Sequence, residues 1–216
     1  METTHSKNSG EERFDVAKVF RRETWCIGES AFAVLLLLIG TSMLDGFYGS
    51  YYNLNQLVFD AFDAPVSIIG IFFGASYAVN ATAYIAADFF SSRFGKRNTM
   101  LGSMLIEAGL FMILPWFASN PLCLFSLSMV LCFLPEVVYI TSENLIQDAI
   151  ADDLRATILS VASLVRALFS AMFFSIFGYV LGLYPIQIAL GVIGAIAIAI
   201  TAVVSLKMVG IHVSKN

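Results

Sequence analysis

Six long apolar stretches, separated by short polar loops, constrain what this chain can fold into more than any other feature. A helix needs roughly 20 mostly apolar residues to cross the ~30 Å hydrocarbon core of a bilayer. Stretches of this kind occupy residues 30–52, 65–90, 98–118, 121–144, 156–183 and 185–206. With 58% hydrophobic and 13% charged residues, the chain is predicted to be an all-α membrane protein with six transmembrane helices.

Proline and small residues refine this prediction. Pro65, Pro121 and Pro185 stand where stretches begin, and a helix start tolerates the missing backbone N–H. Pro135 is interior and is predicted to kink the fourth helix. Small residues at four-residue spacing predict close helix approach. They are Gly70 and Gly74, Gly178 and Gly182, and the set Gly191, Ala195 and Ala199.

Basic residues outside the stretches are confined to alternate loops. They precede the first stretch, join the second to the third and the fourth to the fifth, and follow the sixth, whereas the other three loops contain none. By the positive-inside rule, both termini are predicted to be cytoplasmic, in a multi-pass protein of the plasma membrane. The chain then divides into an amphipathic cytoplasmic segment at 1–28, a membrane domain at 29–207 and a cytoplasmic tail at 208–216.

Charge and residue spacing exclude several classes of function. The net charge is -4 and the acidic residues are dispersed, so no nucleic-acid partner is expected. The three cysteines form no CxxC pair and both histidines lie in the polar ends, so no metal and no other cofactor is expected. No predicted span contains the histidine that an intramembrane serine protease requires, and the chain has no P-loop. We therefore expect no enzymatic activity.

The loop after the second stretch carries a recognisable pattern. Its sequence "RFGKRNTML", residues 93–101, resembles the cytoplasmic loop signature of the major facilitator superfamily of transporters, which follows the second helix of a six-helix half. The family's stricter form has an aspartate immediately before the first basic residue, whereas this chain has Ser92 there and Asp88 one turn earlier. The loop resembles the degenerate copy in the family's C-terminal half.

Two further segments resemble the same half. The stretch "DDLRATILSVASLVRALFSAMFFSIFGYVLG", residues 152–182, resembles the loop and helix that join its fourth and fifth spans. The segment "RFDVAKVFRRETW", residues 13–25, resembles the end of the family's central loop. The resemblance implies a half bundle with nested, inverted three-helix repeats, whose substrate site lies against a second half. That half is either a second copy of the chain or a separate N-terminal half.

Four ionisable residues lie at predicted membrane depth, where a charge costs roughly 2.5 to 3.5 kcal/mol and is expected to face protein or water. They are Asp45, Glu107, Glu136 and Arg166. Arg166 and Glu107 lie at similar depths along their helices and are expected to pair, although Arg166 is alternatively a substrate contact. Glu136, beside Pro135, and Glu107 are the candidates for proton coupling. For Glu136, snorkelling to water is an equal alternative.

The first span contains the most distinctive stretch, "LDGFYGSYYNLNQ", residues 44–56. The resemblance implies that this helix lines the central cavity, and Tyr48, Tyr52 and Asn55 are expected to share one of its faces. An interfacial aromatic belt is the alternative explanation of the tyrosines. The candidate substrate and cavity residues are Asp45, Tyr48, Tyr52, Asn55, Asn80, Tyr84 and Arg166.

The resemblance also implies a cytoplasmic latch, because charged loops in the family hold contacts that strengthen one access state. The candidate latch residues are Asp88, Arg93, Gly95, Lys96, Arg97 and Arg155. Glu143, Asp152 and Asp153 lie on the same side and are the expected partners within this half. The alternative is that the basic cluster serves only as a topological anchor.

These features predict a transmembrane transporter that moves a small solute by alternating access, with proton-coupled efflux as the expected mode. Its expected partners are the lipid bilayer, a small-molecule substrate and the second half described above. The alternative is a truncated or accessory membrane subunit, such as a solute-binding or scaffold module without independent transport.

Overall fold

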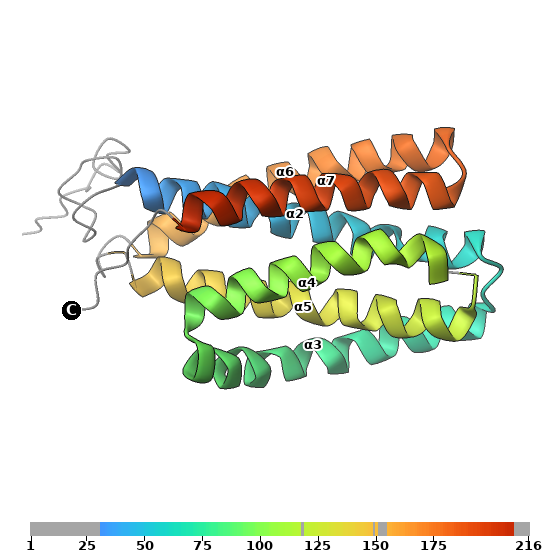
Figure 1. Ribbon diagram of the computed structural model, residues 1–216, viewed down its shortest axis with the longest axis horizontal. Coiled ribbons are helices and arrows are strands. Elements are labelled where there is room, and N and C mark those ends of the chain that lie inside the picture. Colours follow the sequence, from blue (N-terminus) through green and yellow to red (C-terminus); the bar gives the residue numbers. More distant parts are fainter. Residues whose placement is uncertain (1–30, 118, 149, 151–154, 210–216) are drawn as a thin grey trace, which may run out of the picture.

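The computed structural model describes residues 31–117, 119–148, 150 and 155–209 of the chain. Across these residues the chain folds into six helices and forms no strand. They are α2 (Ala31–Ala61), α3 (Val66–Phe94), α4 (Lys96–Phe117), α5 (Pro121–Asp148), α6 (Arg155–Leu183) and α7 (Ile186–Val209) (Figure 1). Five of them, α3 to α7, are long and apolar enough to cross a membrane. The predicted helical order is confirmed, whereas segment 1–28 and most of the tail at 208–216 lie outside the described residues.

Helix α2 ends at Ala61, nine residues beyond the predicted boundary at residue 52. The polar residues near Asn53 suggested a loop, but the helix continues because Val58 and Phe59 are buried in the core. It ends only where Asp63 adopts a φ of 53° and Pro65 begins the next helix. The hydropathy of the segment therefore placed this boundary too early.

The connection between α3 and α4 consists of Gly95 alone. Gly95 has a φ of 83°, a conformation that glycine adopts without the steric cost that a Cβ would impose. Its N–H donates to the carbonyl of Ser91 and closes the end of α3. Lys96 then begins α4, so the charged loop is a sharp reversal that brings its basic side chains to one end of the bundle.

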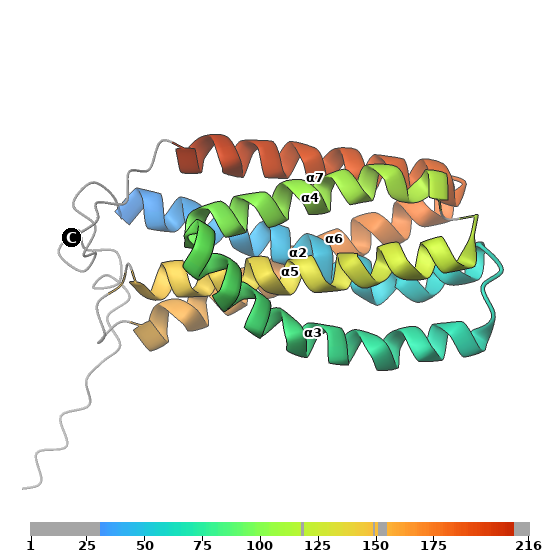
Figure 2. The same cartoon turned by 60° about the horizontal axis from the view of Figure 1, so that its bottom comes forward.

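The helices run along the long axis of the bundle and reverse direction at each connection (Figures 1 and 2). One end, here called the Lys96 end, holds the start of α2, the turn at Gly95 and the end of α7. The opposite end, the Pro65 end, holds the connections at Pro65, Pro121 and Pro185. The described basic residues outside the helix interiors gather at the Lys96 end, as their alternation in the sequence predicted. That this end is cytoplasmic remains a prediction.

Helix α2 occupies the middle of the bundle. It packs most extensively against α6 and also contacts α5 and α7, while α3 packs on α5 and α4 lies between α5 and α7. Phe47 of α2 is fully buried, and its ring meets those of Phe111, Phe173 and Phe177 edge to face, the last with centroids 4.8 Å apart. These aromatic contacts join α2, α4 and α6.

Close helix approach occurs at glycines other than the predicted ones. A Cβ on Gly46 would lie 2.7 Å from both the Cβ of Phe169 and the backbone nitrogen of Ser170, so α2 and α6 touch there through their backbones. Gly194 of α7 similarly faces the backbone of Phe111 in α4. In contrast, no atom of another helix lies within 4 Å of a Cβ at Gly70, Gly74, Gly178, Gly182 or Gly191. The packing role predicted for those glycines is therefore wrong within this bundle.

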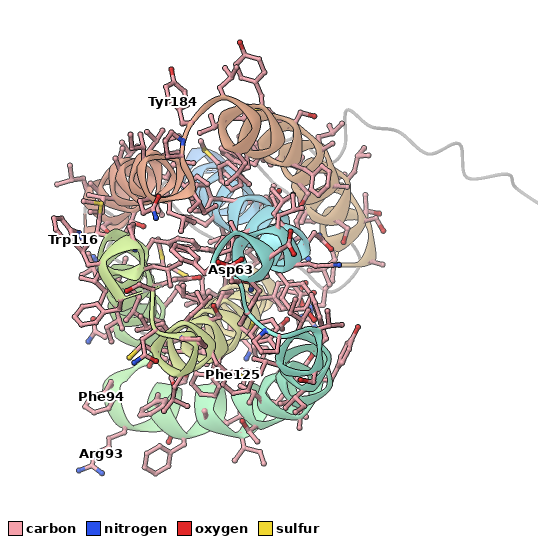
Figure 3. All side chains as sticks on the ribbon, turned by 90° about the vertical axis from the view of Figure 1, so that its right-hand side faces the viewer. Asp63, Arg93, Phe94, Trp116, Phe125 and Tyr184 are labelled. Atoms are coloured by element: carbon pink, nitrogen blue, oxygen red, sulfur yellow. The ribbon has the colours of Figure 1, made fainter. Side chains whose placement is uncertain are left out.

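Aromatic side chains project outward at the Pro65 end. Viewed along the bundle from that end, Trp116 and Tyr184 point away from the helices (Figure 3). Their exposed fractions are 81% and 51%. Amphipathic rings in this position are typical of the boundary between the lipid hydrocarbon and the aqueous phase.

Candidate functional site

A charged cluster joins α2, α5 and α6. Arg166 Nε of α6 lies 2.7 Å from Asp45 Oδ2 of α2, and its terminal nitrogen Nη2 lies 3.6 Å from Glu143 Oε1 of α5. The guanidinium carbon is 4.3 Å from the centre of the Tyr139 ring, close enough for a cation–π contact. Glu136, also on α5, is within electrostatic reach of Asp45 and Arg166. These five residues are called the Arg166 cluster below.

The backbone contact between α2 and α6 brings Asp45 and Arg166 together. The two helices run in the same direction, and the hydroxyl groups of Ser42 and Ser50 donate to the carbonyls of Ala162 and Ser170, at 3.5 and 2.9 Å. Gly46 allows this approach, and Asp45 is its neighbour in the chain. Arg166 lies one turn before Ser170, so it meets Asp45 at the same level.

The cluster lies at the edge of the bundle. The side chains of Asp45, Glu143 and Arg166 are 27%, 26% and 21% exposed. Three carboxylates around one guanidinium give a formal charge of -2 when all four groups are ionised. Among the described residues, no three acidic, cysteine or histidine side chains are placed to hold one metal ion. The bundle therefore encloses these ionisable groups only in part.

The predicted pair of Arg166 with Glu107 is wrong. Glu107 lies on α4, which has no extensive contact with α6, and its side chain is fully buried inside the bundle. Equal depth along two helices fixes the height of two residues but not the direction that each faces. The partner of Arg166 is Asp45, which the sequence had placed only among the substrate contacts.

The polar residues of α2 separate between the core and the surface. Tyr48 is 3% exposed and packs against Phe47 and Phe111, and Asn55 is fully buried. Tyr52 is partly exposed, and its hydroxyl lies 3.1 Å from that of Ser76 on α3. At 100° per residue, Tyr52 is rotated about 40° from Tyr48, whereas Asn55 is rotated about 20° the other way. Of the three residues predicted to share a face, Tyr48 and Asn55 are therefore buried in the bundle, whereas Tyr52 is partly exposed.

The two candidates in α3 lie in different surroundings. The hydrogen-bond network assigns the amide nitrogen of Asn80 to the side facing the carbonyls of Ser76 and Cys132, to which it donates at 3.2 and 3.1 Å. Asn80 thus links α3 to α5. Tyr84 is 57% exposed on the outer side of α3 and is not part of the Arg166 cluster.

At the Lys96 end, Lys96 forms an ion pair with Asp148 in the last turn of α5, with Nζ 2.5 Å from Oδ2. Arg155 at the start of α6 donates to the carbonyl of Gln147 at 3.3 Å. The sequence did not single out Asp148, although it lies at the same end as Lys96. Of the expected partners, Glu143 contacts Arg166 instead, and Asp152 and Asp153 lie outside the described residues.

The other predicted latch residues take different places at this end. Gly95 forms the turn itself, and the Arg93 guanidinium lies 6.0 Å from the ring of its neighbour Phe94. Asp88 is exposed on α3, and Arg97 lies in the first turn of α4. At this end, Lys96 with Asp148 and Arg155 with Gln147 both make contacts that cross between helices.

Exchanging Lys96 for glutamine is expected to lower the free energy of unfolding by only about 0.2–1 kcal/mol, because both partners of this pair are exposed. The difference should shrink as salt is raised from about 0.01 to 1 M, since screening weakens exposed pairs. Chemical unfolding of both proteins in the same detergent measures it. A loss that persists in high salt would contradict an exposed ion pair.

An open apolar groove lies apart from the cluster, between α4 and α5 near the Pro65 end. Its volume is 390 Å³, and it is lined by Ile113, Phe117, Leu122, Cys123, Ser126 and Leu127. With almost no polar lining, the groove fits a lipid chain better than a charged solute.

Comparisons with family models, curated proteins and solved structures found no match to this chain.

Proposed function

We propose that this chain is one six-helix half of a membrane transporter of the major facilitator type, which moves a small solute by alternating access. The observation that carries the proposal is the Arg166 cluster. It places ionisable side chains from three helices at the edge of the bundle, and Asp45 lies midway along α2. Ionisable groups at membrane depth are costly and usually mark a solute or ion pathway.

The helix arrangement supports an inverted repeat. In such a repeat, α2, α3 and α4 are equivalent to α5, α6 and α7 in that order. The contact of α2 with α6 is then equivalent to that of α5 with α3, and both contacts are extensive. The same equivalence relates the contact of α4 with α5 to that of α7 with α2, and these helices also pack together. Such pairing is expected of two equivalent three-helix units related by an axis in the membrane plane.

The exposed edge of the cluster supports a second half. In a single bundle the partly exposed groups of Asp45, Glu143 and Arg166 would face lipid, which is unfavourable for charged side chains. A second copy of the chain, or a separate N-terminal half, would enclose them in a polar cavity. Substrate binding between two halves is the arrangement of this transporter class.

Within this proposal, Arg166 and Asp45 contact the solute and Glu136 exchanges protons. Glu136 follows Pro135 inside α5, where the proline leaves a backbone carbonyl without its helical donor. The pair of Lys96 with Asp148 is the part of the cytoplasmic latch that lies within this half. Its exposure allows it to break and reform as the access state changes.

The first test combines assembly with transport. The chain is purified from its native membrane in a mild detergent, its mass is determined, and co-purifying chains are identified. It is then reconstituted into liposomes, and uptake of a panel of fluorescent solutes is followed with and without an imposed pH gradient. We expect a complex of two halves and gradient-dependent uptake that Glu136→Gln abolishes.

A lone six-helix monomer without uptake would reject the proposal and favour the alternative of an accessory subunit. A complex with an ATPase would favour a solute-binding module instead. As a matched control, Asp63→Asn removes an exposed carboxyl at the Pro65 end and should leave uptake unchanged.

A further inference from the structure

A second ionisable group lies inside the bundle, apart from the Arg166 cluster. Glu107 of α4 is fully buried, and neither of its carboxyl oxygens makes a hydrogen bond within the described residues. No described lysine or arginine forms an ion pair with it. An unpaired carboxylate in an apolar interior is strongly disfavoured relative to the neutral acid. We therefore expect Glu107 to carry a proton.

A hydroxyl group from another helix lies beside this carboxyl, and a second hydroxyl group lies beside the first. The Tyr48 hydroxyl of α2 is near both Glu107 and the Thr201 hydroxyl of α7. All three groups are buried, and none is in hydrogen-bonding geometry with another described group. A carboxylic acid and two hydroxyls each offer one donor and at least one acceptor. They can hold a water molecule and pass a proton between them.

Two rows of buried hydroxyl groups lead from Glu107 toward the Lys96 end. On α4, Thr99 and Ser103 precede Glu107 at four-residue spacing, so all three lie on one buried face. On α7, Thr201 and Ser205 are also four residues apart, and both have buried hydroxyls that make no hydrogen bond within the described residues.

The two rows lie at matching heights on helices that pack against each other. Helices α4 and α7 are antiparallel, and Gly194 meets the backbone of Phe111. Counting along both helices from this contact places Thr201 level with Met104 and Ser205 level with Met100. The hydroxyls of α7 therefore lie at the heights of those on α4.

Three titratable groups on other helices interact with Glu107. Asp45 and Tyr48 face it from α2, and Cys132 interacts with it from α5. None of these groups is a cation, and α7 contributes the neutral Thr201. Helix α3 meets α4 through the turn at Gly95, and its titratable residues there, Asp88 and Arg93, are exposed.

We propose that Glu107, Tyr48 and Thr201 form a proton-binding site in the interior of the bundle, connected to the Lys96 end by the hydroxyl rows of α4 and α7. The site lies between α2, α4 and α7 and is complete within one chain. It does not depend on solute transport, because none of its three residues belongs to the Arg166 cluster or to a second half, and Asp45 acts on it only through its charge.

Infrared spectroscopy of the whole chain in nanodiscs tests the site directly. A protonated carboxyl has a C=O stretching band that a carboxylate lacks, and the band shifts when the acidic proton is exchanged for deuterium. We expect Glu107→Gln to remove one such band at neutral pH and Tyr48→Phe to shift it. The neutral glutamine matches the protonated acid in shape, so this variant should fold. Asp63→Asn, which removes an exposed carboxylate, should leave the band unchanged.

The rate of deuterium exchange tests the hydroxyl rows. Thr201→Val removes the hydroxyl with little change in shape and should slow exchange of the Glu107 proton severalfold, whereas Thr201→Ser should keep the wild-type rate. Identical carboxylic acid bands in the wild type and Glu107→Gln would overturn the proton site. An unchanged rate in Thr201→Val would overturn its connection to the Lys96 end. A protein that transports no solute should still show the Glu107 carboxylic acid band. The proton site and the transport function are therefore tested separately.

Discussion

Replacing Arg166 with glutamine should abolish transport and lower the free energy of unfolding by about 2–3 kcal/mol. Removing one partner of a buried ion pair costs about 3–5 kcal/mol, because the other charge is left without compensation. The Arg166 side chain is one-fifth exposed, and solvent therefore reduces the cost. Asp45 and Glu143 would lose the only cation within 4 Å in the described part of the chain. Unfolding of wild type and variant in the same detergent measures the change.

A second substitution separates charge compensation from packing. If the loss arises from the unpaired carboxylate, Asp45→Asn combined with Arg166→Gln should be more stable than Arg166→Gln alone. Arg93→Gln is the matched control, because Arg93 is exposed at the Lys96 end, and we expect a change below about 0.5 kcal/mol there. Equal stability of the single and double variants would show that Asp45 and Arg166 do not interact.

The helices of this protein could be predicted from its sequence because the length of a membrane span is a backbone constraint. Every buried N–H and C=O needs an intrahelical partner in hydrocarbon, so a long apolar stretch leaves little choice of structure. Pro65, Pro121 and Pro185 then located three helix starts to within a residue. The boundary of α2 failed because Val58 and Phe59 are held in the helix by tertiary packing, which local polarity does not report.

The neighbours of each helix could not be predicted in the same way. Gly70 and Gly74 have the spacing of a packing motif but face outward, whereas Gly46 and Gly194 make the close contacts. Four-residue spacing identifies a row of small residues on one face of a helix, but it does not identify the helix that packs against that face. Arg166 shows the same limit, because its position along the helix suggested Glu107 as its partner, and only the arrangement of α2 and α6 identifies Asp45.

The sequence therefore singled out three of the five residues of the Arg166 cluster, but not their geometry. Asp45, Glu136 and Arg166 were recognised because ionisable groups are rare in a span. Glu143 was assigned to the latch, and Tyr139 carried no signal, since a tyrosine near a helix end is ordinary. The sequence also counted Tyr48 among the cavity residues, whereas the structure places it beside Glu107 in the interior.

Gly46 and Gly49 should respond to alanine with opposite signs, although they lie on the same helix three residues apart. Alanine in a helix interior is favoured over glycine by up to about 1 kcal/mol. At Gly49 nothing opposes this gain, because the nearest atom to a Cβ is the Ser170 hydroxyl at 3.8 Å. We expect Gly49→Ala to raise the free energy of unfolding by about 0.5–1 kcal/mol.

At Gly46 the steric cost should exceed the gain. The new Cβ would lie 2.7 Å from the Ser170 nitrogen, a backbone atom that moves only with its helix. Overpacking of this kind costs about 1–3 kcal/mol, so Gly46→Ala should be destabilising by about 1–2 kcal/mol after the propensity gain. Separating α2 from α6 would also stretch the contact of Asp45 with Arg166, so Gly46→Ala should impair transport while Gly49→Ala does not. Equal stability of the two variants would show that these helices do not meet at Gly46, and the Arg166 cluster would lose its structural basis.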